Sequence, residues 1–249
     1  MDEPRSILLL HGVGSSASTW WRAVEDLTEL GWTVTALDLL GHGGRPLGSD
    51  APLGSDGPLG LDDLARDVRA QAGPTRFDVV LGHSLGALVA LTLAAQEPGR
   101  ARLVLLEDPP ALGGSFTTDE VADQLVGDAA RARAHPAAFA SELAAANPRW
   151  AARDVAAVVE NRRRLAVGPV TGLLRDSSWD LLALVAGCPV PVGLIAAEGP
   201  DTALVPPVRA DVLAALPADR QVLVPGGHGL HRDRPARWLE AVLRLTGRT

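Results

Sequence analysis

The sequence contains a single cysteine, Cys188, so an internal disulfide is excluded. Lysine is absent, and all 23 basic residues are therefore arginines, outnumbered by 30 acidic residues for a formal net charge of -7. Binding to a phosphate backbone depends on basic residues clustered on one face. The only run of basic residues spans 162–164, and we interpret it as the solvated face of a helix. We therefore expect no nucleic acid partner.

Long apolar runs are also missing. No stretch approaches the roughly 18 apolar residues of a membrane-spanning helix, so we expect no membrane partner. The N-terminus reaches a short apolar run at Ile7 without the basic flank of a signal peptide. These features predict a cytoplasmic protein.

Residue clusters that would hold a metal or a dinucleotide are absent. The six histidines are scattered and the cysteine has no partner, so we expect no metal site. Gly12 and Gly14 lack the third glycine that a dinucleotide-binding loop needs. We expect no cofactor, and no sequence pattern fixes the oligomeric state.

Short apolar runs alternate with longer amphipathic segments along the chain. Continuous apolar runs of four to eight residues are typical of strands buried on both faces. Helical patterns follow at 87–96 and 235–245, whereas the Gly- and Pro-rich stretch 46–60 predicts a surface loop. The predicted strands are 6–10, 32–37, 77–81, 103–106, 190–197 and 221–224. This alternation predicts an α/β fold with a mostly parallel, doubly wound sheet.

One long segment interrupts the alternation. Residues 111–186 contain no convincing strand but carry several amphipathic helical patterns, so we expect an all-helical cap insertion. The core would then consist of 1–110 and 187–249. Within the insertion, a helix is predicted over 149–167, with Asn147 as its N-terminal cap.

The strongest chemical signal is Gly82, His83, Ser84, Leu85 and Gly86, between an apolar run and a helical pattern. This is G-x-S-x-G at a predicted strand-to-helix turn, where small residues allow a tight bend that exposes the serine hydroxyl. Ser84 is therefore the candidate nucleophile.

A serine hydroxyl needs a base to take its proton, and His228 is the best candidate. It lies in a Gly-flanked loop after the last predicted strand, from where its ring can approach the strand ends. His231 is interpreted as an exposed start of the last helix, His135 falls in the insertion, and His42 is interpreted as a loop-shaping residue.

Two further motifs resemble the α/β-hydrolase family. Residues 11–14, His-Gly-Val-Gly, are similar to its H-G-x-G loop, and residues 38–43 resemble its D-x-x-G-H-G loop. With Ser84 and His228, the resemblance covers about residues 6–245 apart from the insertion. It implies an oxyanion hole made by the backbone amides of Val13 and Leu85, and a bracing role for His11.

The triad acid has three candidates. In most family members it follows the strand after the cap, and Asp201 fits that position best. Asp108, at the end of the strand 103–106, is the main alternative because some family members place the acid there. Glu198 is a third candidate.

The resemblance implies a serine hydrolase that cleaves a carboxylic ester, lactone or thioester of a small, mainly apolar and neutral substrate through an acyl-enzyme on Ser84. Large aromatic residues near the insertion either line the substrate pocket or pack internally. They are Trp20, Trp21, Phe116, Phe139, Trp150 and Trp179. Alternatives are a catalytically silent ligand-binding protein, or a cofactor-free lyase or perhydrolase.

Overall fold

The computed structural model describes residues 5–47, 59–111, 118–176, 178–206 and 208–247. Six strands form one sheet in the order β2-β1-β3-β4-β5-β6, and every neighbouring pair is parallel. The strands are β1 Ser6–Leu10, β2 Thr33–Leu37, β3 Phe77–His83, β4 Ala101–Glu107, β5 Val192–Ala197 and β6 Gln221–Val224. All six lie where apolar runs predicted them.

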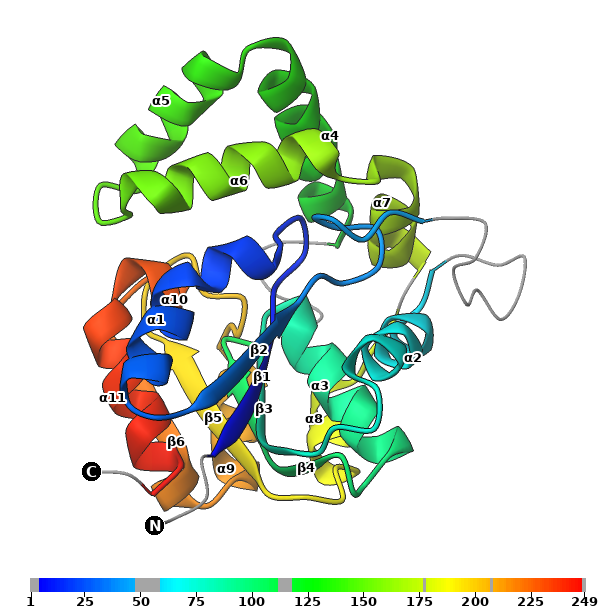
Figure 1. Ribbon diagram of the computed structural model, residues 1–249, viewed down its shortest axis with the longest axis vertical. Coiled ribbons are helices and arrows are strands. Elements are labelled where there is room, and N and C mark those ends of the chain that lie inside the picture. The colour runs from blue at the N-terminus through cyan, green and yellow to red at the C-terminus, as the bar shows by residue number, and fades with distance from the viewer. Residues whose placement is uncertain (1–4, 48–58, 112–117, 177, 207, 248–249) are drawn as a thin grey trace.

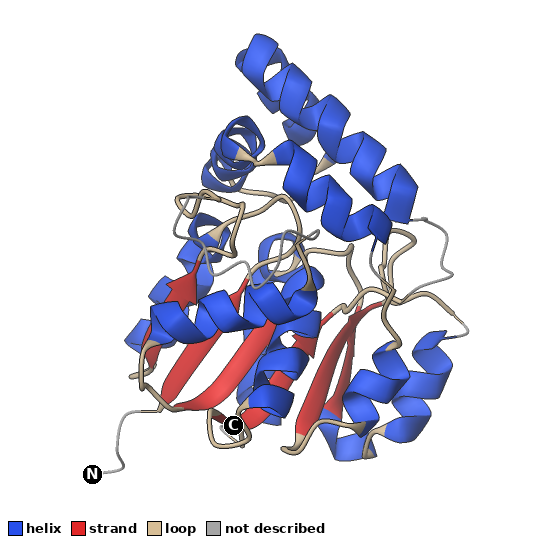
Figure 2. Cartoon of the chain, turned by 90° about the vertical axis from the view of Figure 1, so that its right-hand side faces the viewer, coloured by secondary structure: helices blue, strands red, loops and turns tan. Residues whose placement is uncertain are grey.

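Helices cover both faces of the sheet. Successive strand residues point to opposite faces, and because these residues are apolar, both faces need a layer of helices. In β1, Ile7 and Leu9 pack in one buried cluster, which includes residues of α1 and α11. Leu8 and Leu10 pack in the other, which includes residues of α2, α3 and α8. The layers are visible in Figure 2. The core helices are η1 Ala17–Trp20, α1 Trp21–Glu29, α2 Leu61–Ala72, α3 Leu85–Gln96, α8 Leu181–Ala186, α9 Val208–Ala215, η2 Ala218–Arg220, α10 Leu230–Asp233 and α11 Pro235–Leu245. The sheet is doubly wound, as predicted.

Four helices between β4 and β5 lie together beyond the ends of the strands (Figure 1). They are α4 Thr118–Ala134, α5 Pro136–Ala146, α6 Ala152–Arg164 and α7 Val167–Asp176. α8 also falls within the predicted insertion, but its buried residues Leu181 and Val185 pack in the same cluster as α3. The helical layer over the strand ends is therefore shorter than the segment 111–186.

The start of α6 differs from the prediction. Asn147 lies at the C-terminal end of α5, where its Nδ2 donates to the Leu143 carbonyl at 2.9 Å, instead of capping the next helix. A turn follows, and α6 begins at Ala152, with the Asp154 carboxylate accepting from the Ala151 amide at 2.9 Å. The side chain that accepts a hydrogen bond from the backbone at the start of α6 is therefore Asp154, which lies within the helix, and not a residue before it.

Two other predictions concern the surface. Most of the predicted loop 46–60 lies outside the described residues. Among the helices of the described ranges, none combines the length and the apolar character needed to cross a bilayer.

Candidate active site

Ser84 lies at a sharp bend between β3 and α3. Its backbone has φ 53° and ψ -121°, a conformation that residues with side chains rarely adopt. The flanking glycines make this bend possible: a Cβ on Gly82 would lie 2.1 Å from the Gly86 carbonyl oxygen, and one on Gly86 would lie 2.3 Å from the Leu10 carbonyl oxygen. Only glycine fits at both positions, which explains the G-x-S-x-G pattern physically.

The residue paired with His228 is Asp108. Nδ1 of His228 donates to Oδ2 of Asp108 at 2.6 Å. This hydrogen bond fixes the tautomer and leaves Nε2 free to accept a proton. The prediction of Asp201 as the partner of His228 is corrected by this contact, and the alternative Asp108 takes its place.

Asp108 is held as an acceptor of several hydrogen bonds. It is buried directly after β4, with φ 42°. Thr202 Oγ1 donates to its Oδ1 at 2.6 Å, and the Ala203 amide donates to its Oδ2 at 2.8 Å. Both carboxylate oxygens of Asp108 therefore have hydrogen-bond donors in this structure.

The loop after β5 thus brings a hydrogen-bond donor, Thr202, to Asp108 instead of a carboxylate to His228. Asp201 and Glu198 are exposed, whereas the next residue, Thr202, is buried against Asp108. Because the loop turns the Thr202 side chain inward, the Asp201 carboxylate faces solvent at the rim of the pocket.

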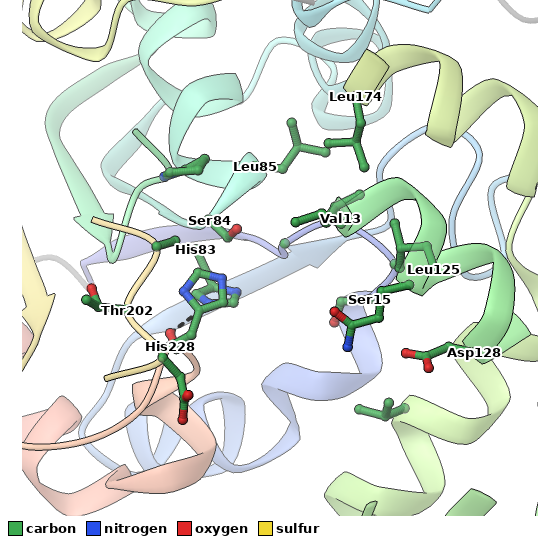
Figure 3. Close-up of a pocket in the computed structure, with 18 of the residues that line it drawn as sticks. Val13, Ser15, His83, Ser84, Leu85, Leu125, Asp128, Leu174, Thr202 and His228 are labelled. Atoms are coloured by element: carbon green, nitrogen blue, oxygen red, sulfur yellow. Dashed lines mark hydrogen bonds between the residues drawn. The ribbon is translucent and has the colours of Figure 1, made fainter. Parts of the chain in front are cut away.

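Ser84 and His228 line the same pocket, a cavity of about 530 Å³. Figure 3 shows them on one side of this pocket, with Leu125 of α4 and Leu174 of α7 on the other. The contacts of the described residues include no hydrogen bond between Ser84 Oγ and His228, so their catalytic pairing remains a proposal. His83, which precedes the serine, donates from Nε2 to the His228 carbonyl oxygen at 3.0 Å and holds the base loop near β3.

The two predicted oxyanion amides also belong to this pocket. Leu85 is the first residue of α3, so its amide has no acceptor within the helix. Val13 lies in the loop after β1, which His11 braces: Nδ1 donates to the Gly12 carbonyl at 2.8 Å, and Nε2 accepts from the Leu39 amide at 3.0 Å. Burial lowers the pKa of His11 to about 4, which keeps this bracing ring neutral.

Arg162 of α6, one of the helices over the strand ends, contacts the same loop. Its guanidinium donates to the Gly14 carbonyl and lies 3.4 Å from the Asp128 carboxylate. The prediction of a solvated basic face at 162–164 is therefore wrong for Arg162. Arg163 and Arg164 do lie at the surface, where both pair with Glu160.

His231 is buried, and its predicted exposure is wrong. Its Nδ1 donates to Glu107 at 2.8 Å, and Trp238 Nε1 donates to the other oxygen of the same carboxylate at 2.9 Å. Burial holds the pKa of His231 well below its usual value. His231 is thus a neutral structural histidine that joins α10 to the end of β4.

The aromatic residues divide between packing and the pocket. Trp150 and Trp179 line the cavity, whereas Trp20 and Phe139 are buried in hydrophobic clusters. Phe116 lies outside the described residues. Among the residues that the structure describes, no group of histidine, cysteine and acidic side chains has the arrangement of a metal site.

Comparison with known families agrees with this architecture. Residues 7–241 match the family described as Alpha/beta hydrolase family. The chain belongs to this family. The match includes all six strands apart from the first residue of β1, the four helices over the strand ends, and both Ser84 and His228.

Curated proteins similar to this α/β-hydrolase carry the names of several hydrolases. Lipase LipV of Mycobacterium tuberculosis is 38% identical over 140 residues, 54% of this chain and 50% of that protein. The putative carbamate hydrolase RutD of Variovorax paradoxus is 39% identical over 104 residues, 41% of this chain and 37% of that protein. A pimeloyl-(acyl-carrier protein) methyl ester esterase of Neisseria meningitidis is 36% identical over 137 residues, 47% and 40% of the two chains. The chain therefore spans half or less of these relatives.

Solved structures share the fold over nearly the whole length of this α/β-hydrolase. An N-formylmaleamic acid deformylase of Pseudomonas putida has a TM-score of 0.77 at 24% identity, covering 96% of this chain and 92% of that chain. An enol-lactonase of Burkholderia xenovorans has a TM-score of 0.71 at 23% identity, covering 98% and 92%. At these identities the likeness concerns the fold.

Proposed function

We propose that the protein is a serine hydrolase that cleaves an ester-type bond through an acyl-enzyme on Ser84. The observation that carries this proposal is the 2.6 Å hydrogen bond from buried Asp108 to His228, a histidine that lines the same pocket as Ser84 at its strained bend. A protein that only binds a ligand requires neither an imidazole oriented by a carboxylate nor a serine hydroxyl exposed at a strained bend.

The proposed reaction begins with proton transfer. Nε2 of His228 takes the proton of Ser84 Oγ as the oxygen attacks the substrate carbonyl, and Asp108 stabilises the imidazolium that forms. Negative charge develops on the carbonyl oxygen. The backbone amides of Val13 and Leu85 would stabilise it by donating hydrogen bonds to this oxygen. Each such donor is typically worth about 3 to 4 kcal/mol of barrier. His228 then protonates the leaving group, and water releases the acyl group by the same steps in reverse order.

We further propose that α4 to α7 act as a cap over this chemistry. Apolar side chains of these helices, including Leu125, Val158 and Leu174, line the cavity. A largely apolar roof excludes water and strengthens the electrostatic interactions beneath it. A cavity of about 530 Å³ suits a small substrate.

The names of the relatives support ester-type chemistry. A lipase and a methyl ester esterase both act on carboxylic esters by name, and a carbamate hydrolase acts on a related acyl bond. All three chemistries begin with nucleophilic attack on a carbonyl carbon, which the arrangement around Ser84 serves.

Covalent labelling with a fluorophosphonate probe tests the proposal. We expect the wild type to be labelled at Ser84 and to hydrolyse members of a panel of p-nitrophenyl esters, lactones and thioesters. Ser84→Ala should lose both labelling and turnover. A wild type without labelling or turnover contradicts the proposal, and turnover that survives Ser84→Ala assigns the chemistry to another mechanism.

A further inference from the structure

The pocket wall formed by α10 and α6 contains two arginines, Arg232 and Arg162. Arg232 follows His228 by four residues, so the base and this cation are carried by one short segment. An unmatched charge in a mainly apolar cavity is costly unless something compensates it. The partners of each arginine therefore show whether the pocket is electrically balanced.

Arg162 is compensated by the protein. Its guanidinium lies against the Asp128 carboxylate and donates to the Gly14 carbonyl. Asp128 also forms an ion pair with Arg131, whose Nη2 lies 2.6 Å from Oδ1 of Asp128, so this pocket carboxylate already faces two cations. The Asp128 carboxylate is therefore already paired and does not compensate the charge of Arg232.

Among the residues that the structure describes, Arg232 has no such partner. Its Nε is buried and without a hydrogen-bond acceptor, and within the described ranges no carboxylate oxygen lies within 4.0 Å of its guanidinium. Its ring neighbour is Trp150, whose face lies 4.3 Å from the guanidinium carbon. Burial lowers the pKa of Arg232 to about 10, so the group keeps its charge at neutral pH.

The carboxylates around Arg232 are engaged elsewhere. Those whose charge acts on it are Glu107, Asp154 and Asp233. Glu107 accepts from His231 and Trp238, Asp154 accepts from Trp21 and Ala151, and Asp233 accepts from Gly227 and Arg149. Asp201, the remaining acidic residue of the pocket lining, is exposed. Within the described part of the chain, the guanidinium of Arg232 therefore faces the pocket without a protein hydrogen-bond acceptor.

We infer that Arg232 is a specificity-determining residue that binds a carboxylate of the substrate, at a point of the pocket apart from the bond that Ser84 attacks. This inference rests on the proposed function and deepens it, because it replaces the expected neutral substrate with a small ester whose apolar body ends in an anion. The planar guanidinium matches a carboxylate geometrically, and stacking on Trp150 holds it flat.

Matched esters test the inference. The p-nitrophenyl monoesters of adipic and suberic acid are compared with the analogues in which the free carboxyl is a primary carboxamide, which removes the charge at nearly constant shape. For the wild type we expect kcat/KM to be about tenfold to a hundredfold higher for the acid than for the amide, the range of a charge-assisted hydrogen bond. Arg232→Gln should reduce this ratio to near one, and Arg232→Lys should restore part of it.

Arg237→Gln is the matched control, because Arg237 is exposed on α11, pairs with Glu240 and does not line the pocket. It should leave the ratio at the wild-type value. If Arg232 served only to stack on Trp150, Arg232→Gln would lower activity on acid and amide equally, and an unchanged ratio overturns the inference.

Direct binding separates this inference from the proposed function. Calorimetric titration of Ser84→Ala with monomethyl adipate and with its carboxamide analogue requires no turnover. We expect tighter binding of the acid in Ser84→Ala, and loss of the difference in the double variant with Arg232→Gln. Equal binding of acid and amide, together with Ser84-dependent hydrolysis, refutes the carboxylate site alone. Arg232-dependent binding without any hydrolysis refutes the proposed function alone.

Discussion

At the scale of single residues, Asp108 organises the candidate site. It lies at φ 42°, in a region of backbone conformation that costs free energy for a residue other than glycine. The cost is offset because the bend presents one carboxylate to His228, Thr202 and the Ala203 amide together. The proposed triad acid therefore lies directly after a central strand.

Asp108→Asn should reduce kcat on a p-nitrophenyl ester by about 10³ to 10⁴, because an amide in place of the carboxylate favours the wrong imidazole tautomer. Steady-state kinetics with near-ultraviolet circular dichroism checks the effect and the integrity of the fold. Asp201→Asn is the matched control, and its effect should be much smaller. A larger loss in Asp201→Asn than in Asp108→Asn would return the acid to the loop after β5.

Some of these residues could be predicted from the sequence, and others could not. Ser84 was identifiable because the bend requires glycine two positions before and two positions after it, so the local sequence records the geometry. The acid was not, because Asp108 and Asp201 both follow buried strands, and only the packing of Thr202 against Asp108 separates them. Arg232 left no local signal either, since its environment is assembled from α6, α10 and Trp150.

At the scale of elements, α6 is tied to the loop after β1. Arg162 donates to the Gly14 carbonyl, and a Cβ on Gly14 would collide with that guanidinium at 2.2 Å. The helix α6 therefore contacts the loop that contains the Val13 amide. The proposed cap and the proposed oxyanion hole share this contact.

Arg162→Met should lower kcat about tenfold while changing KM less, because the loop loses the contact between Arg162 and the Gly14 carbonyl and the Val13 amide becomes less well positioned. This is a fraction of the 10² to 10³ lost when an oxyanion donor is removed outright. Arg163→Met, which replaces an exposed neighbour paired with Glu160, is the control and should retain wild-type kinetics. Equal kinetics for the two variants would show that Arg162 does not position the loop.

Elements were predicted with unequal success for a physical reason. A strand buried on both faces must be continuously apolar, so β1 matches its predicted bounds. The edge strand β6 also matches, although most of its residues are only partly buried. The helix α11 also matches, because Pro235 suits its first turn. The start of α6 was misplaced because Asn147 satisfies the end of one helix as readily as the beginning of another. The inward turn of Arg162 depends on a loop nearly 150 residues earlier.

At the scale of the whole molecule, we expect buried histidines to make the stability of the fold sensitive to acid. Burial lowers the pKa of His11 to about 4 and that of His42 to about 3. A histidine with a depressed pKa takes up its proton more readily when the chain is unfolded. The stability it contributes is complete above its unfolded pKa of about 6.5 and is lost as the pH falls toward the folded value.

We expect the free energy of unfolding to fall as the pH is lowered from 6.5 to 4, with His42 contributing roughly 1 kcal/mol per pH unit. The raised pKa of Glu107 acts in the opposite direction, so the test compares slopes between variants. Urea denaturation at several pH values, followed by tryptophan fluorescence, should give a shallower slope for His42→Asn than for the wild type. Exposed His135 is the control, and His135→Asn should keep the wild-type slope.

The end of β4 has one more consequence for the molecule as a whole. Two adjacent residues there reach both reacting partners: the Glu107 carbonyl accepts from the Ser84 amide at 3.0 Å, and Asp108 holds the His228 ring. The position of the Ser84 hydroxyl and that of the His228 imidazole therefore both depend on the end of β4. Neither of these two contacts comes from the helices over the strand ends, so the spacing of the proposed nucleophile and base rests on the sheet and not on the proposed cap.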